Sequence, residues 1–128
     1  MTRVSSHKDL IVWQKSLALA SKIYAATRNL PPHERHGLQS QMRRSAISVA
    51  SNIAEGAGRT GRTEYIRFLN IARGSLTELE TQLYITSDLE WIDRSLHLEE
   101  DVAEVGRLLT SLIQKLREQR SRDRPQPY

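Results

Sequence analysis

The residues in this chain best suited to bind a ligand are the arginines around a short glycine-rich segment. Residues 56–62 read GAGRTGR and carry two arginines. Backbone amides exposed in such a turn, together with two guanidinium groups, can contact a phosphate. The segment lacks the GxxxxGK[ST] spacing of a P-loop, so it does not indicate nucleotide hydrolysis. The alternative interpretation is structural, with the glycines ending one helix and letting the chain turn into the next.

Phosphate contact is the chemistry that we predict for the basic side of the protein. The residues predicted to contact RNA or DNA are Arg43, Arg59, Arg62, Arg67 and Arg73. Aromatic residues make up 5% of the chain and mostly fall on predicted core stripes, so base stacking is not favoured. We therefore expect salt-sensitive binding to backbone phosphates, with weak sequence specificity.

The polar residues of the same region do not indicate a catalytic or metal site. Glu55 is the only carboxylate in residues 35–63, so a pair of catalytic acids is absent there. His33 and His36 have i, i+3 spacing, but the sequence offers no evident third ligand. We predict no catalytic residue, no metal and no cofactor. A helical enzyme with a site at Arg44 and Glu55 is a less favoured alternative.

A polar seam is predicted along one side of the helix that precedes the glycines. Arg44, Ser48, Ser51 and Glu55 follow one another at i, i+4, i+7 and i+11, which places one charge of each sign on this side. Short side chains here would let another backbone approach closely. We assign a structural or oligomer-contact role to Arg44, Ser48, Asn52, Glu55 and Gly56. The expected partner of Glu55 is Arg44, a neighbour of Asn52, or an arginine of another copy.

Charge is distributed unevenly along the chain. The 128 residues have a net charge of +4, but residues 1–76 hold 12 Lys and Arg against 4 Asp and Glu, a net +8. Residues 77–116 hold 3 against 9, a net −6, and residues 117–128 hold 4 against 2, a net +2. Such a split suits a polyanion on the basic side, or contact between the basic and acidic surfaces of two copies.

Composition also indicates the cellular compartment of the protein. The chain has no cysteine, its first residues lack the apolar segment of a signal peptide, and no apolar run is long enough to cross a bilayer. We expect a cytoplasmic protein with no membrane contact.

Apolar residues at 3,4 spacing predict four helices. These helices would position the arginines and polar residues described above. The first runs from about Leu10 to Arg28, the second from about Pro32 to Ala57, the third follows the linker 59–62, and the fourth has its stripe from Leu98 to Leu116. The stripe of the first helix is Leu10, Trp13, Leu17, Ala20, Tyr24 and Thr27. Trp91 and Ile92, in the turn 87–95, are expected to close one end of the core.

These segments predict an all-α fold, an antiparallel up-down-up-down four-helix bundle. We expect a single domain over residues 1–128, with a core at about 10–116 and a flexible arginine-rich tail at 117–128. The second helix has an apolar arc covering half its wheel, interrupted only by Arg43, and small polar residues opposite. This apolar arc is wider than contact with one other helix requires, so we predict that the chain forms a homo-oligomer.

Three blocks of sequence, DLIVWQKS, QMRRSAISVASNIAEGAGR and EYIRFLNIARGSLTELETQL, occur here in order. They resemble the 23S rRNA intervening-sequence proteins, over about Leu10 to Leu116, although members often have proline where this chain has Ala50. The resemblance implies a four-helix bundle that assembles into a ring, described for relatives as a pentamer. The chain is also similar to the accessory variability protein of diversity-generating retroelements, a basic ring that binds nucleic acid and a reverse transcriptase.

The leading hypothesis is therefore a non-enzymatic, homo-oligomeric protein that binds rRNA or another polyanion, or that acts as a scaffold. The alternative is a structural or protein-interaction module that binds no nucleic acid. Saturable, salt-dependent binding to nucleic acid distinguishes the two.

Overall fold

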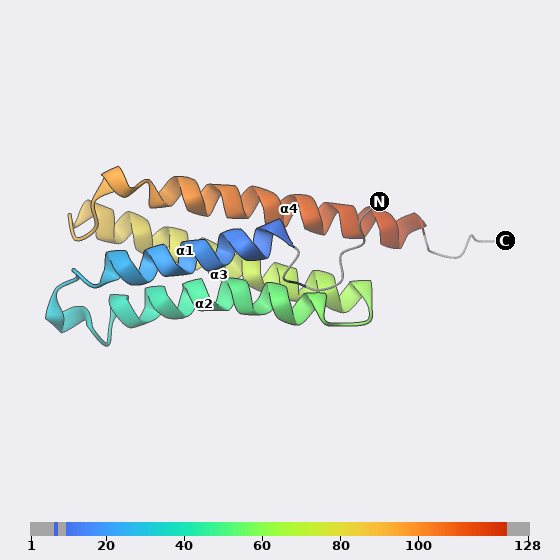
Figure 1. Cartoon of the computed structure of the whole chain (residues 1–128), viewed down its shortest axis with the longest axis horizontal. Coiled ribbons are helices and arrows are strands. Elements are labelled where there is room, and N and C mark those ends of the chain that lie inside the picture. The colour runs from blue at the N-terminus through green and yellow to red at the C-terminus, as the bar shows by residue number, and fades with distance from the viewer. Residues whose placement is uncertain (1–6, 8–9, 123–128) are drawn as a thin grey trace.

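The computed structural model, which describes His7 and residues 10–122, contains four α-helices arranged as a bundle (Figure 1). They are α1 (Ile11–Thr27), α2 (Leu38–Ala57), α3 (Arg62–Asp88) and α4 (Leu98–Arg122), with two short 3₁₀ turns, η2 (Pro32–Glu34) and η3 (Arg94–Leu96), in the connections. Successive helices run in opposite directions, and α1 begins and α4 ends at the end of the bundle that holds the α2–α3 turn (Figure 1). No strand occurs among the described residues. The predicted all-α, antiparallel four-helix fold is confirmed.

Each helix packs against two others around one apolar core. α1 contacts α2 and α4, and α3 contacts the same two helices, so the four form a square. The largest fully buried side chains come from all four helices and include Ile23, Met42, Ile53, Leu69, Leu79, Leu83, Leu109 and Ile113. Burying one such side chain stabilises a fold by about 1.5–3 kcal/mol. Ile92 is buried and Trp91 packs against the core, as predicted for the turn between α3 and α4.

The face that α1 buries differs from the predicted stripe. Ile23 is buried, whereas Leu17 and Tyr24 of that stripe are 42% and 37% exposed. Two sets of residues with 3,4 spacing exist on this helix, and spacing alone does not separate them. Ser16 belongs to the buried set because its hydroxyl donates to the Val12 carbonyl at 2.7 Å, which satisfies the hydroxyl inside the core. The predicted core face was therefore right at Thr27, which is buried, and in part at Leu10, Trp13 and Ala20, which pack against the core, but it was wrong at Leu17 and Tyr24.

α2 begins at Leu38, and the prediction that it begins at Pro32 was wrong. The chain forms η2 after the prolines, and Gly37 then leaves the helical region with φ −104° and ψ −114°. The Glu34 carboxylate accepts a hydrogen bond from the Leu38 amide at 2.9 Å, so it satisfies one of the free amides at the start of α2. A Cβ atom on Gly37 would overlap this carboxylate, so glycine leaves the Glu34 side chain room to reach the Leu38 amide.

Most of the apolar residues at 3,4 spacing in α3 and α4 are buried. The buried residues are Leu69, Ala72, Leu76, Leu79 and Leu83 in α3, and Leu98, Val102, Val105, Leu109 and Leu116 in α4. Ile113 is buried, and its neighbour Leu112 is half-buried against the core. α4 continues to Arg122, so the first part of the predicted tail is helical, and residues 123–128 lie outside the described residues. In the part of the chain that is described, no helix combines the length and apolar character needed to cross a membrane.

Candidate nucleic-acid interface

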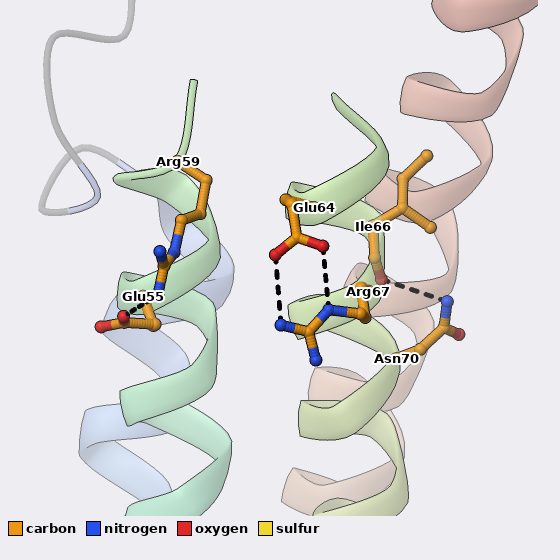
Figure 2. A network of polar contacts seen from close by, with 6 residues as sticks. All are labelled: Glu55, Arg59, Glu64, Ile66, Arg67 and Asn70. Carbon is orange, nitrogen blue, oxygen red and sulfur yellow. Dashed lines mark hydrogen bonds and ion pairs between the residues drawn. The ribbon is translucent and has the colours of Figure 1, made fainter. Parts of the chain in front are cut away.

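The arginines at the α2–α3 end of the bundle are paired with glutamates. Arg59 donates to Glu55, one helical turn before it, and Arg67 donates to both carboxylate oxygens of Glu64, at 3.0 and 3.1 Å (Figure 2). The guanidinium groups of Arg59 and Arg67 also lie over the ring of Phe68, 4.9 and 4.6 Å from its centroid. The positive charge predicted for this end is therefore largely compensated by local carboxylates.

The Glu64–Arg67 pair changes how both groups titrate. The hydrogen bond donated by Arg67 lowers the pKa of Glu64, and the charges of Arg67 and Arg59 act in the same direction. The same hydrogen bond raises the pKa of Arg67. Both side chains are about half exposed, so solvent screens the pair and its main effect is to lower the local positive charge.

The two remaining arginines predicted on α3 lie in different surroundings. Arg62 is the first residue of α3 and is half-buried. Arg73 donates to the Asn70 side chain at 2.8 Å and lines a groove of about 550 Å³ between α3 and α4, together with Glu80 and Arg107. The structure thus brings Arg59 and Arg67 together around one ring, and it places Arg73 in a separate groove.

Arg43 joins α1 to α2. Its Nε donates to the Thr27 hydroxyl at 2.9 Å and its Nη2 donates to the Tyr24 carbonyl at 3.1 Å, while the guanidinium covers the Tyr24 ring at 4.5 Å. Gln39 donates to the Thr27 carbonyl at 3.0 Å. The last turn of a helix leaves carbonyls without partners and favours a nearby positive charge. Arg43, predicted to contact phosphate, is therefore committed to capping the end of α1.

A second basic region lies at the opposite end of α2, in a groove of about 420 Å³ between α1 and α2. Its lining is Tyr24, Arg35, His36, Gln39, Ser40, Arg43, Arg44 and Ile47, without a carboxylate. We call this the α1–α2 groove. Arg44 donates to the Ser40 hydroxyl at 3.2 Å, and Glu55 bonds to Arg59 instead, so the predicted pairing of Arg44 with Glu55 was wrong. Eleven residues separate Arg44 from Glu55, about 16 Å along a helix, which no side-chain pair spans.

The sequence profile of the 23S rRNA-intervening sequence proteins matches residues 8–111. This chain belongs to that family. A similar solved structure, at 1.70 Å, is a protein with unknown function from the S23 ribosomal protein family of Bacteroides thetaiotaomicron. It is 31% identical, with a TM-score of 0.76, and the match covers 84% of this chain and 98% of that one. No curated protein matches the chain. The family predicted from the three sequence blocks is confirmed.

In this member of the 23S rRNA-intervening sequence family, the residues assigned to structural or oligomer contacts hold α2 against α3. The Ser48 hydroxyl bonds to that of Ser75 at 2.8 Å, and Asn52 donates to the Ser48 carbonyl and hydroxyl at 2.8 and 3.0 Å. A Cβ on Gly56 would lie 2.9 Å from the Phe68 Cβ, so glycine permits the close approach of the two helices. Ser48, Asn52 and Gly56 thus act within one copy of the chain.

Sequence reasoning did not assign Arg35, His36, Tyr24 or Ile47 to a shared binding site, although it considered His36 as a metal ligand and Tyr24 as a core residue. Arg35, Gln39 and Arg43 recur at i, i+4, a spacing that could have indicated a shared face. His33 does not join His36, since the His33 ring meets the edge of the Trp91 ring at a centroid distance of 6.0 Å. Among the described residues, no three His, Asp or Glu side chains gather as metal ligands.

Proposed function

We propose that this chain is a non-enzymatic, self-associating bundle that binds nucleic acid through its phosphates. The observation that carries the proposal is the cluster of arginines within residues 28–44, namely Arg28, Arg35, Arg43 and Arg44. None of them forms an ion pair with a described residue, whereas Lys15 and Lys22 of α1 pair with Glu104 and Asp101 of α4 at 3.2 and 3.0 Å. An uncompensated cluster of arginine attracts a polyanion.

The family name supports RNA as the first polyanion to test, because it refers to 23S rRNA. Neither that name nor the description of the solved relative refers to an enzymatic reaction. The enzyme alternative has less support here, because Arg44 and Glu55 bond to different neighbours and do not form one site.

Titration of the full-length protein against a structured RNA and a duplex DNA, by fluorescence anisotropy at several salt concentrations, tests the proposal. Phosphate binding gives a log Kd that rises linearly with log salt, with a slope of about 0.9 per phosphate contacted on duplex DNA. Absence of saturable binding to either nucleic acid at low salt would refute nucleic-acid binding.

Self-association is supported by apolar side chains left exposed near the end of α3. Tyr84, Ile85 and Leu89 are 53%, 43% and 50% exposed, and they fall within about 140° of the helix circumference. Light scattering at micromolar concentration measures the assembly. A mass of about 74 kDa, five times the 14.7 kDa of one chain, is expected for a pentamer, and a mass of one chain refutes self-association.

The same exposed residues favour a second candidate function, a protein-interaction module that binds no nucleic acid. Replacing Tyr84 and Ile85 with serine distinguishes the roles of this surface. A lower assembly mass with unchanged nucleic-acid affinity per chain places self-association there, whereas an unchanged mass removes these residues from the self-contact.

A further inference from the structure

We propose that the α1–α2 groove binds an unpaired nucleotide of a nucleic-acid strand, with the phosphate held by Arg35 and Arg44 and the base packed against Tyr24 and Ile47. The inference rests on the proposed function and names the site that would perform it. The α2–α3 end, which the sequence favoured, is then a secondary contact.

The charge of the groove suits a phosphate. The side chains of Arg35 and Arg44 are exposed, and among the described residues Arg44 donates its hydrogen bond to a neutral hydroxyl, that of Ser40. Glu34, the only carboxylate in residues 28–54, accepts a hydrogen bond from the Leu38 amide and does not line the groove. Arginine presents a planar set of donors that matches two phosphate oxygens at once, so two uncommitted guanidinium groups form a strong phosphate site.

Arg44 also lines the neighbouring groove between α2 and α3, whose described lining includes one acidic residue, Glu78. The guanidinium of Arg44 bonds to Ser40, which lies on the α1–α2 side. No ion pair joins Arg44 to Glu78 among the described residues, so the charge of Arg44 remains available to a ligand in the α1–α2 groove.

The apolar part of the groove suits a base. Tyr24 and Ile47 are 37% and 46% exposed there, although both belong to residue types that are usually buried or half-buried. Arg43 stacks on the Tyr24 ring and bonds to the Tyr24 carbonyl, so the ring is held in place before any ligand arrives. A fixed aromatic ring loses little conformational freedom on binding and accepts the face or edge of any base.

The combination selects an unpaired nucleotide over a duplex. A volume of about 420 Å³ lies within the range of small-molecule sites, roughly 300–1,000 Å³. Bases of a duplex are stacked on one another, so a base reaches Tyr24 only from a single strand, a loop or a bulge.

The test uses the full-length protein with a fluorescein-labelled 12-nucleotide single-stranded RNA and with the duplex of the same sequence. Arg35→Gln with Arg44→Gln removes two charges from the groove. Arg59→Gln with Arg62→Gln removes two charges from the other end of α2 and serves as the matched control. Circular dichroism and thermal melting verify that each variant keeps the parent fold.

We expect the groove pair to weaken single-strand affinity by about tenfold or more and to lower the salt slope by about 1.4, at roughly 0.7 per phosphate contact on single strands. The control pair should cost less than threefold. Tyr24→Leu should weaken single-strand binding by about fivefold to tenfold and leave duplex binding unchanged, because stacking acts on unpaired bases.

Four outcomes would overturn the inference. If the control pair loses affinity and the groove pair does not, phosphate contact belongs to the α2–α3 end, and the proposed function stands without this site. If Tyr24→Leu weakens neither substrate, or if inorganic phosphate displaces the RNA as well as adenosine monophosphate does, the groove takes an anion and no base. If the parent protein binds no nucleic acid at low salt, the proposed function fails and this site fails with it.

Discussion

The two ends of α2 carry arginines in opposite surroundings, although the sequence makes them look alike. At the α2–α3 end, Arg59 and Arg67 form ion pairs with glutamates three or four residues before them, Glu55 and Glu64. At the end near α1, the described partners of Arg43 and Arg44 are hydroxyl and carbonyl groups. The number of arginines therefore says little about the available positive charge, because the charge that a ligand meets depends on the partners that each guanidinium already has.

The ends also differ in packing. At the C-terminal end of α2, Gly56 permits a close approach to α3, because a Cβ atom there would lie only 3.2 Å from the Tyr65 carbonyl oxygen. At the N-terminal end, Gln39 and Arg43 bond to the last turn of α1, and both residues also line a groove between the two helices. The first end is thus closely packed, whereas the second leaves a groove that a ligand can enter.

The largest effect is expected from Gly56→Ala. An added Cβ would lie 2.9 Å from the Phe68 Cβ and 3.2 Å from the Tyr65 carbonyl oxygen, so the helices must move apart. Overpacking of this kind costs about 1–3 kcal/mol, which outweighs the roughly 1 kcal/mol that alanine gains over glycine in a helix. Because the added Cβ meets a backbone atom as well as side-chain atoms, we expect the upper part of this range, about 2–3 kcal/mol, and chemical denaturation should show a net loss of about 1–2 kcal/mol.

Gly61→Ala is the matched control for this substitution. A Cβ on Gly61 meets no atom within 4 Å, and its φ of −110° is open to alanine. The unfolding free energy should stay within about 0.5 kcal/mol of the parent or rise slightly. Equal losses in the two variants would contradict the close approach of α2 and α3 at Gly56.

Arg43→Ala should come next, because it separates a structural arginine from an accessible one. It removes two charged hydrogen bonds to the end of α1 from a half-buried site, and each such bond contributes about 1.5–3 kcal/mol at most. We expect a loss of about 1–2 kcal/mol in unfolding free energy, since water replaces part of the interaction.

The next residue, Arg44, is exposed. Arg44→Ala should therefore change the free energy of unfolding by less than about 0.5 kcal/mol. Thermal melting of both variants side by side provides the check. If Arg44→Ala lowers the melting temperature more than Arg43→Ala does, the assignment of capping to Arg43 is wrong.

Glu55→Gln should raise affinity for duplex DNA by a few-fold, because it removes a negative charge and releases Arg59 from its partner. Glu90→Gln, an equal change in charge at an exposed residue of the α3–α4 turn, is the control and should have a smaller effect. Anisotropy titrations at one salt concentration compare the two. Equal effects would mean that only the net charge of the protein matters and that the pairing of Arg59 does not.

The sequence predicted the helices well because each buries a stripe that the 3,4 spacing reveals. It failed for α1, where Leu17 and Tyr24 fit the spacing as well as the buried residues do, and burial depends on which side the neighbouring helices occupy. It failed for the start of α2 because the sequence alone does not show that the Glu34 carboxylate caps the helix in the space beside Gly37.

The candidate site was predictable only in part, for a related reason. The Glu55–Arg59 and Glu64–Arg67 pairs have the i, i+4 and i, i+3 spacings of helical ion pairs, so they were readable from the sequence. The α1–α2 groove was not, because it joins the last turn of α1 to the first turns of α2 around Arg35. Such a surface exists only once the two helices have packed.

The smallest effect concerns pH at the α2–α3 end. The hydrogen bond from Arg67 holds the pKa of Glu64 below its ordinary value of 4.5, so the pair stabilises the fold above pH 4.5 and this contribution disappears as the pH falls through the lowered pKa. Over the same range Glu64 becomes protonated and releases Arg67, so phosphate affinity at this end should rise. A carboxyl titration by NMR should give a lower pKa for Glu64 in the parent than in an Arg67→Gln variant. If the two titrate alike, Arg67 is not held by Glu64 in solution, and the α2–α3 end is as available to a polyanion as the α1–α2 groove.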